Sequence, residues 1–221
     1  MKLTIGTCQF PVRADIRGNR DWMLRQMKEA RGRGADVVHF GEGALGGYAG
    51  ASFPSFDGYD WLLLESCTKD IMRQARRLRL WVLMGSNRRL TGNHKPHNSV
   101  YVINDRGAIV DRYDKTFCFG SKEGDGDLKH YSPGSHFATF KIRNVTCSAL
   151  ICYDFRFPEL YRELYRRGVS VVYAPALPPG FTPILRNSAV PSKTFPKSNC
   201  AMNKPSATAI PLCGSELPTW L

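Results

Sequence analysis

The segment VTCSALICYDFRFPELYR, residues 145–162, constrains the fold more than any other part of the chain. It begins with an apolar run that stops at Cys152, continues through a polar and aromatic turn, and resumes with apolar residues at helical spacing. Pro158 stands where the first turn of a helix tolerates a proline. The pattern therefore predicts a strand, a sharp turn and a helix, with a cysteine at the turn.

The position of Cys152 is open to two interpretations. A thiol at the carboxyl end of a strand lies where open α/β sheets place their chemistry, and a nearby helix N-terminus favours the thiolate. A free cysteine is, however, more often a buried residue of the core. This segment alone does not decide between a nucleophile and a core thiol.

The length and composition of the chain indicate one globular domain of ordinary size. Its 221 residues are 43% hydrophobic and 23% charged, which are values of globular proteins. No apolar run approaches the roughly 18 residues of a membrane span, and MKLTIGTCQF becomes polar too early for a signal peptide. The seven cysteines form no C-x-x-C pair and show no metal-ligand spacing, which favours reduced thiols and a cytoplasmic location over a disulfide framework.

The net charge of +12 raises the question of nucleic acid as a partner. The basic residues are dispersed, and no zinc-finger, RRM or basic-zipper pattern is present. His94 and His97 share a turn without an adjacent carboxylate or thiol, so we expect a solvent-exposed loop there and no metal site. We therefore expect neither nucleic acid nor a membrane as a partner. The densest basic cluster is best explained as a solvated helix face: Arg73, Arg76, Arg77 and Arg79.

Alternation and helical periodicity predict the elements of the fold. Meandering strands mixed with strand–helix–strand units indicate an α/β fold in which helices cover a mixed sheet. The expected helices span about 19–33, about 60–79 and the stretch from the Cys152 turn to residue 167. The expected strands span 2–10, 35–40, 80–87, 98–104, 108–114, 137–143, 145–151 and 169–176.

The character of the chain changes after about residue 176. Eight of the 14 prolines lie in residues 178–221, which contain one acidic residue and no clear helical or strand period. This composition predicts coil. We therefore divide the chain into a domain at 1–178 and a divergent Pro/Ser/Lys-rich tail at 179–221.

Glu42, Lys115 and Cys152 each follow the end of an apolar strand, directly or within two residues. Such strand ends can converge on one crevice of an α/β sheet. There a thiolate can attack an electrophilic carbon, a carboxylate can take the proton and later activate water, and an ammonium can stabilise the oxyanion. A neighbouring lysine would also lower the pKa of the cysteine thiol.

Each of the two upstream residues also has an ordinary explanation. Glu42 could be a loop carboxylate that accepts backbone N–H groups, and Lys115 could be a surface lysine. The spacing of the three residues leaves these alternatives open.

The motifs around the three residues resemble the nitrilase or carbon–nitrogen hydrolase superfamily, in particular its amidase and Nit-type branches. The resemblance covers residues 1 to about 176. It implies a four-layer αββα fold, a dimer, and a Cys–Glu–Lys triad that hydrolyses non-peptide C–N bonds of small amides without a cofactor. The motifs are VVHFGEGALGGY, DRYDKTFCFG, HYSPGS and LICYDFRFPELYR.

The resemblance implies a role for each matching residue. Cys152 would form a thioester, and Glu42 would act as general base and acid. Lys115 and the backbone N–H of Tyr153 would stabilise the oxyanion. Family members often carry a second glutamate in the loop before the Pro-Gly turn, and Glu123 is the candidate in this chain.

Arg156 has two interpretations of its own. It could hold a carboxylate of the substrate, or it could form a structural salt bridge to Asp154 or Glu159.

The family's domain continues past VSVVYAPA with further strands and a helix, and here the proline-rich tail replaces them. We therefore expect a sandwich that is incomplete at its C-terminus. The alternative to an active amidase is a catalytically inactive truncated paralogue that acts as a binding or dimerising partner.

Overall fold

The computed structural model describes residues 3–121, 125–176 and 207–213. The first half comprises β1 (Leu3–Gln9), α1 (Ile16–Gly32), β2 (Val37–Phe40), α2 (Trp61–Leu78), β3 (Trp81–Arg88), β4 (His97–Ile103) and β5 (Ile109–Asp114). The second half comprises α3 (Gly126–His130), β6 (Phe140–Ile142), β7 (Val145–Ala149), the 3₁₀ helix η1 (Cys152–Arg156), α4 (Pro158–Arg166), β8 (Val171–Tyr173) and β9 (Ala207–Cys213).

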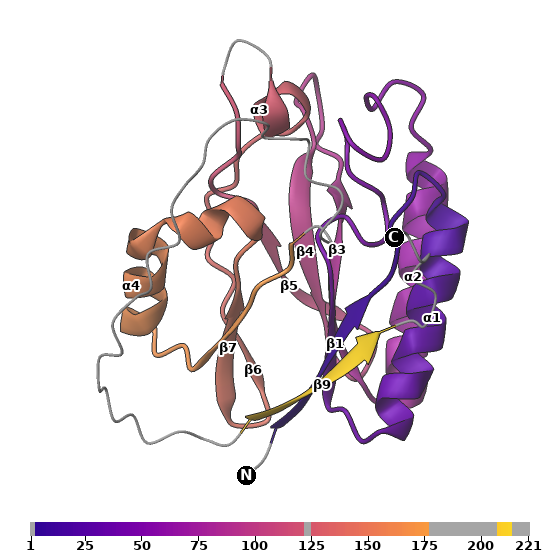
Figure 1. Ribbon diagram of the computed structural model, residues 1–221, viewed down its shortest axis with the longest axis vertical. Coiled ribbons are helices and arrows are strands. Elements are labelled where there is room, and N and C mark those ends of the chain that lie inside the picture. The colour runs from indigo at the N-terminus through magenta and orange to yellow at the C-terminus, as the bar shows by residue number, and fades with distance from the viewer. Residues whose placement is uncertain (1–2, 122–124, 177–206, 214–221) are drawn as a thin grey trace, which may run out of the picture.

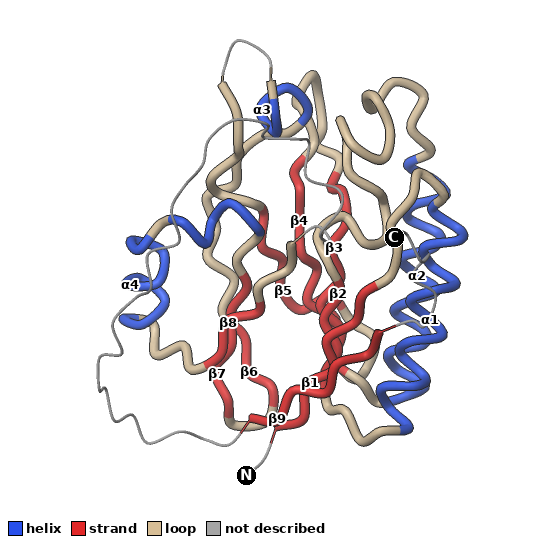
Figure 2. Tube along the Cα trace, viewed as in Figure 1, coloured by secondary structure: helices blue, strands red, loops and turns tan. Residues whose placement is uncertain are grey.

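The strands form two sheets that pack between two layers of helices (Figure 1). The larger sheet has the order β5-β4-β3-β2-β1-β9, and the smaller one has the order β6-β7-β8. Helices α1 and α2 cover the outer face of the larger sheet, and α4 lies on the outer side of the smaller sheet (Figure 2). The four-layer αββα arrangement expected from the sequence is therefore confirmed.

The larger sheet is mixed, as the meandering strands predicted. Strands β1, β2 and β3 pair in parallel, whereas β3–β4 and β4–β5 are antiparallel. Two antiparallel steps restore the direction of the strand, so β5 runs the same way as β2. In the smaller sheet β6 and β7 form an antiparallel hairpin, and β7 pairs in parallel with β8.

Two apolar layers separate the elements. One lies between the helices and the larger sheet and includes Met27, Ile71 and Val82. The other lies between the two sheets and includes Leu83 and Tyr173. Val82 and Leu83 are neighbours in β3 and face opposite layers, because successive side chains of a strand point to opposite faces. The near-continuous apolar run of β3 follows from burial on both faces.

Both long helices begin at an aspartate cap. Asp15 accepts a hydrogen bond from the Gly18 N–H at 3.0 Å, and Asp60 accepts one from the Leu63 N–H at 2.8 Å. Such caps satisfy backbone donors that a first helical turn leaves without partners. The first helix therefore begins at Ile16, three residues before the predicted start.

The expectation of coil throughout the tail is wrong for residues 207–213. These residues form β9, which pairs in parallel with β1 from Leu3–Ala207 to Gln9–Cys213. Because β9 is an edge strand, Pro211 can occupy it without breaking a ladder on both sides. The rest of the predicted tail lies outside the described residues.

Among the described residues, no helix has the length and apolar character needed to cross a membrane. The cysteines of this part of the chain carry free thiols, in agreement with the reduced state expected from their spacing. They are Cys8, Cys67, Cys118, Cys147 and Cys152.

His39 occupies the layer between the sheets. Its Nε2 lies 3.0 Å from the hydroxyl of Thr7, and its ring centroid lies 5.6 Å from that of Tyr173 on the opposite sheet. Burial lowers the pKa of His39 to about 4. The side chain is therefore neutral in the folded protein at neutral pH.

We expect His39 to make the protein less stable in acid. The unfolded chain binds a proton at this residue below about pH 6.5, whereas the folded chain does so only near its lower pKa. The free energy of unfolding should fall by about 1–3 kcal/mol through this window, and a His39→Gln variant should lack this contribution. Urea unfolding of both proteins at about pH 7 and about pH 4.5 measures it. A difference between the two proteins that does not vary with pH would contradict the assignment.

Candidate active site

The three residues predicted to act together lie together in the structure. Glu42 follows β2, Lys115 follows β5, and Cys152 begins η1 three positions after the last residue of β7. The Nζ of Lys115 is 2.9 Å from Oε1 of Glu42, and the Cys152 thiol is close enough for both groups to act on its pKa. They converge because β2 and β5 run in the same direction and end at the same edge of the sheet.

Glu42 is 1% exposed, and the donors described for its carboxylate are side chains, not the backbone N–H groups of the alternative interpretation. Its Oε1 accepts hydrogen bonds from Lys115 Nζ at 2.9 Å and from the Asn98 amide at 2.7 Å. The other oxygen, Oε2, is buried and accepts no hydrogen bond of normal geometry from the described residues. The loop that carries Glu42 passes so close to β3 that a Cβ at Gly85 would lie 2.1 Å from the Gly41 carbonyl oxygen.

Lys115 is 2% exposed, which excludes the alternative of an ordinary surface lysine. Its backbone N–H donates to the Asn98 carbonyl at 2.9 Å, and its own carbonyl accepts from the Gly134 N–H at 2.8 Å. The ammonium forms ion pairs with two carboxylates, Glu42 at 2.9 Å and Asp127 at 2.7 Å. Backbone and side chain together hold this cation in one place.

Cys152 lies at a strained turn. Its φ of +46° is in the left-handed region, which side chains with a Cβ rarely adopt. Its N–H donates to the Pro175 carbonyl at 2.9 Å, and the Glu42 N–H donates to the next carbonyl, that of Ala176, at 3.3 Å. The short segment after β8 therefore holds the backbones of both Cys152 and Glu42.

The thiol of Cys152 is protonated in the resting site. Burial and the Glu42 carboxylate raise its pKa to about 11, and the lowering effect of Lys115 does not offset them. The sequence pattern correctly indicated that Lys115 favours the thiolate. The net shift is nevertheless upward, because burial and the Glu42 carboxylate outweigh one ammonium. Attack by this sulfur therefore needs a base that takes the proton.

Asp127, in the short helix α3, was missed by the sequence analysis. It is 1% exposed, and its Oδ2 accepts from the Phe119 N–H at 2.9 Å as well as binding Lys115. Burial and the carboxylates of Glu42 and Asp154 raise its pKa to about 7. The resemblance indicated a glutamate in the loop before the Pro-Gly turn, but an aspartate can place a carboxylate beside Lys115 as well. The candidate named there, Glu123, lies outside the described residues.

Arg156 does not form the salt bridge that was one of its two interpretations. Its side chain is exposed, its guanidinium lies 5.6 Å from the ring centroid of Tyr153, and it makes no ion pair with Asp154 or Glu159 in the described ranges. Asp154 is buried, with other donors around it. Binding of a substrate carboxylate by Arg156 stays a prediction.

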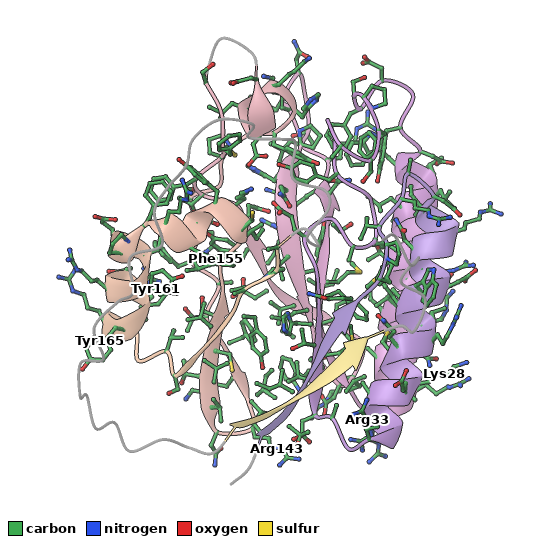
Figure 3. The ribbon with its side chains drawn as sticks, viewed as in Figure 1. Lys28, Arg33, Arg143, Phe155, Tyr161 and Tyr165 are labelled. Carbon is green, nitrogen blue, oxygen red and sulfur yellow. The ribbon has the colours of Figure 1, made fainter. Side chains whose placement is uncertain are left out.

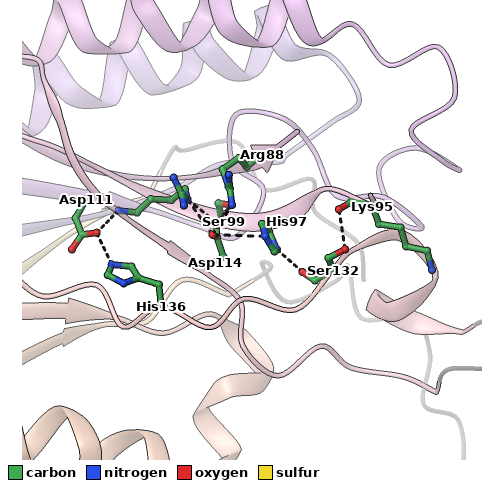
Figure 4. Close-up of polar contacts among 9 residues, drawn as sticks. Arg88, Lys95, His97, Ser99, Asp111, Asp114, Ser132 and His136 are labelled. Atoms are coloured by element: carbon green, nitrogen blue, oxygen red, sulfur yellow. Dashed lines mark hydrogen bonds and ion pairs between the residues drawn. The ribbon is translucent and has the colours of Figure 1, made fainter. Parts of the chain in front are cut away.

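A polar network surrounds Asp114, the last residue of β5, which immediately precedes Lys115 in the chain (Figure 4). Asp114 accepts hydrogen bonds from Ser99 at 2.6 Å and from Arg112 at 3.0 Å. His97 Nδ1 lies 2.7 Å from the Ser132 carbonyl oxygen. His97 is buried at the start of β4, so the expectation that it belongs to an exposed loop is wrong.

We expect replacement of Lys115 by methionine to destabilise the protein strongly. The change leaves the buried Glu42 and Asp127 carboxylates without their cation, and breaking a buried pair in this way costs about 3–5 kcal/mol. The loss should shrink at about pH 5, where carboxylates can take up protons. Urea unfolding measures both effects.

The matched control is Lys141→Met, at an exposed lysine of β6. It should change stability by less than about 0.5 kcal/mol. Equal losses in the two variants would show that Lys115 does not neutralise buried charge.

Comparison with known proteins places these features in a family. The family model of the carbon–nitrogen hydrolases matches residues 4–203, beyond the point at which the motifs end. The 2-oxoglutaramate amidase of Bacillus subtilis (strain 168) is 27% identical over 176 residues, which cover 80% of this chain and 65% of that protein. Nitrilase homolog 2 of Dictyostelium discoideum is 24% identical over 196 residues, covering 84% and 59%. The chain thus spans about three fifths to two thirds of the length of these relatives.

The fold has counterparts among solved structures. The crystal structure of an amidase from Nesterenkonia sp. matches with a TM-score of 0.68 and 20% sequence identity. The match covers 78% of this chain and 64% of that one, and at this identity it establishes the fold alone. With the family model matched from residue 4 to residue 203, the chain belongs to the carbon–nitrogen hydrolase family.

Proposed function

We propose that this chain hydrolyses small linear amides, with Cys152 as nucleophile, Glu42 as general base and acid, and Lys115 as oxyanion stabiliser. The observation that carries the proposal is the buried contact between Lys115 and Glu42 beside the Cys152 thiol. These are the three functions that acyl transfer from an amide requires.

In the first half of the reaction, Glu42 takes the thiol proton as the sulfur of Cys152 attacks the amide carbon. The thiol is protonated at rest, so the proton transfer accompanies the attack. The tetrahedral intermediate collapses when Glu42 returns the proton to the departing nitrogen. Ammonia or an amine leaves, and the acyl group remains on sulfur as a thioester.

In the second half, Glu42 removes a proton from water, and the resulting hydroxide attacks the thioester carbon. The collapse of this intermediate releases a carboxylic acid and restores the Cys152 thiol. Side chains and water account for every proton in both halves, and we expect no cofactor.

The negative oxygen of both intermediates needs fixed donors. Lys115 is one candidate, since its ammonium is buried and held by two carboxylates. The backbone N–H of Tyr153, the residue after Cys152, is the other. Preorganised donors of this kind are worth about 10²–10³-fold each in rate.

Asp127 takes the place proposed for the second carboxylate. Its Oδ2 lies 2.7 Å from Lys115 Nζ and accepts a hydrogen bond from the Phe119 N–H at 2.9 Å. We propose that it orients the ammonium of Lys115 and does not itself exchange protons with the substrate.

Related proteins support amide substrates. The relatives include amidases for 2-oxoglutaramate and for deaminated glutathione. A glutamate-to-glutamine variant of the Nesterenkonia amidase carries the acetamide moiety of fluoroacetamide covalently at its active-site cysteine. The comparisons do not favour the alternative of an inactive truncated paralogue. A homo-oligomer and a cytoplasmic location stay predictions.

We expect fluoroacetamide to modify Cys152. In a Glu42→Gln variant, peptide mapping by mass spectrometry should find one acetamide group on this residue. Cys118 is the internal control, because it is also a half-buried free thiol and lies near Lys115. Equal labelling of the two cysteines would contradict an amide-binding nucleophile at Cys152.

The same assignment predicts release of ammonia from a small amide such as propionamide. Cys152→Ala and Glu42→Gln should each lower this rate by at least about 10³-fold, whereas Cys118→Ala should not. Ammonia release that survives Cys152→Ala would exclude the mechanism. Labelling of Cys152 without any ammonia release would favour the binding alternative.

We expect Asp127→Asn to make Cys152 more reactive and the enzyme slower. The Asp127 carboxylate contributes to the raised pKa of the thiol, so its removal should lower that pKa and accelerate alkylation by iodoacetamide several-fold at about pH 8. Looser orientation of Lys115 should lower kcat by about tenfold. Asp125→Asn, at an exposed aspartate two positions away, is the control and should change neither rate. Unchanged alkylation in Asp127→Asn would contradict the proposed arrangement of charges.

A further inference from the structure

Asp154 is a buried carboxylate to which the mechanism assigns no role. It is 0% exposed and accepts three hydrogen bonds. Its Oδ2 accepts from the Ile151 N–H at 3.0 Å and from the Tyr113 hydroxyl at 2.8 Å, and its Oδ1 accepts from the Phe117 N–H at 2.8 Å. Its charge is therefore met by three donors of the protein and is not directed at solvent.

In the sequence, Asp154 and its three donors lie on either side of two residues of the candidate site. Ile151 immediately precedes Cys152 in the chain, and Asp154 follows it by two positions, so one contact spans the turn that carries the thiol. Tyr113 and Phe117 stand two positions before and two positions after Lys115. The Asp154 carboxylate is thus hydrogen-bonded to residues before and after Lys115 and to the residue before Cys152.

Aromatic packing joins the same two segments. The rings of Phe117 and Phe157 stack with centroids 3.7 Å apart, and the ring of Tyr153 meets that of Phe119 at 5.4 Å. These contacts hold the segments together without directional bonds. The hydrogen bonds of Asp154 are directional and define how one segment is placed along the other.

The turn itself needs such support. Cys152 has a left-handed φ of +46°, and a strained residue persists only when its surroundings over-determine it. The Ile151 N–H would be left without a described acceptor if the Asp154 carboxylate were lost. The bond closes the turn across the strained residue.

We propose that Asp154 is a positioning residue, which sets the place of the Cys152 sulfur relative to the Lys115 ammonium through its bonds to Ile151, Tyr113 and Phe117. The inference rests on the proposed amidase activity. In this proposal Asp154, the aspartate of the CYDFR sequence, does not bind the substrate and does not transfer a proton. An error of about 1 Å in the placement of a reacting group can cost about 10²-fold in rate.

The test compares Asp154→Asn with the unchanged chain in ammonia release from a small amide. The asparagine side chain retains one acceptor oxygen but turns an NH₂ group toward one of the donors. We expect kcat to fall about 10- to 100-fold, with KM within about twofold, because binding of the amide does not involve Asp154. A loss confined to KM, or an unchanged kcat, would overturn the proposal.

Asp36→Asn is the matched control for a merely structural effect. Asp36 accepts the Thr4 N–H at 2.9 Å and pairs with Arg143, so the same substitution removes an ion pair and perturbs a backbone contact. Arg143 and Phe155, which are neighbours of Asp36 and Asp154 respectively, lie well apart in the molecule (Figure 3). The control should lose stability and keep kcat. An equal fall of kcat in both variants would show a general effect of destabilisation and would overturn the proposal.

Tyr113→Phe tests the same contact if Asp154→Asn does not fold. It removes one donor to Asp154 and keeps the ring, so kcat should fall about two- to fivefold. In a chain that carries both changes, kcat should be no lower than with Asp154→Asn alone, because the two act through one bond. Additive losses, or no loss in Tyr113→Phe, would contradict the positioning role. Absence of ammonia release and of fluoroacetamide labelling in the unchanged chain would instead remove the proposed function itself.

Discussion

The buried ion cluster of Lys115 with Glu42 and Asp127 is the interaction on which the rest of this structure depends. Charges are stable away from water only when partners of opposite sign and hydrogen bonds replace the solvent. Here one ammonium serves two carboxylates, the Asn98 amide donates to Glu42, and the Phe119 N–H donates to Asp127. The second oxygen of each carboxylate is buried and accepts no hydrogen bond of normal geometry from the described residues. The strands that carry these groups must therefore end at the correct depth in the sandwich.

The same cluster also acts on the pKa of the Cys152 thiol, the proposed nucleophile. Burial and the Glu42 carboxylate raise the pKa of the Cys152 thiol more than the Lys115 ammonium lowers it, and this keeps the proton on sulfur. Such a site differs from one that stores a reactive thiolate. In the proposed mechanism the sulfur becomes nucleophilic when Glu42 takes its proton.

Sequence reasoning found the parts of the site that follow buried strands, because an apolar run has a visible end and Glu42, Lys115 and Cys152 stand at three such ends. Asp127 was not found because α3 is a helix of five residues, too short for any period to show. The strand β9 was hidden by the prolines around it, since an edge strand tolerates a residue that a central strand excludes. The direction of the Cys152 pKa shift depends on burial, which a sequence does not display.

The carbonyls of Pro175 and Ala176 have a mechanical consequence. The first holds the N–H of Cys152, whose turn belongs to the smaller sheet, and the second holds the N–H of Glu42, whose loop belongs to the larger sheet. Two consecutive peptide groups therefore link the two sheets beside the proposed nucleophile and the proposed base. If one sheet moved relative to the other, the hydrogen bond from the Glu42 N–H to the Ala176 carbonyl would break. The same movement would separate the Cys152 sulfur from the Glu42 carboxylate. A shear between the sheets would therefore also disrupt the geometry that the proposed reaction needs.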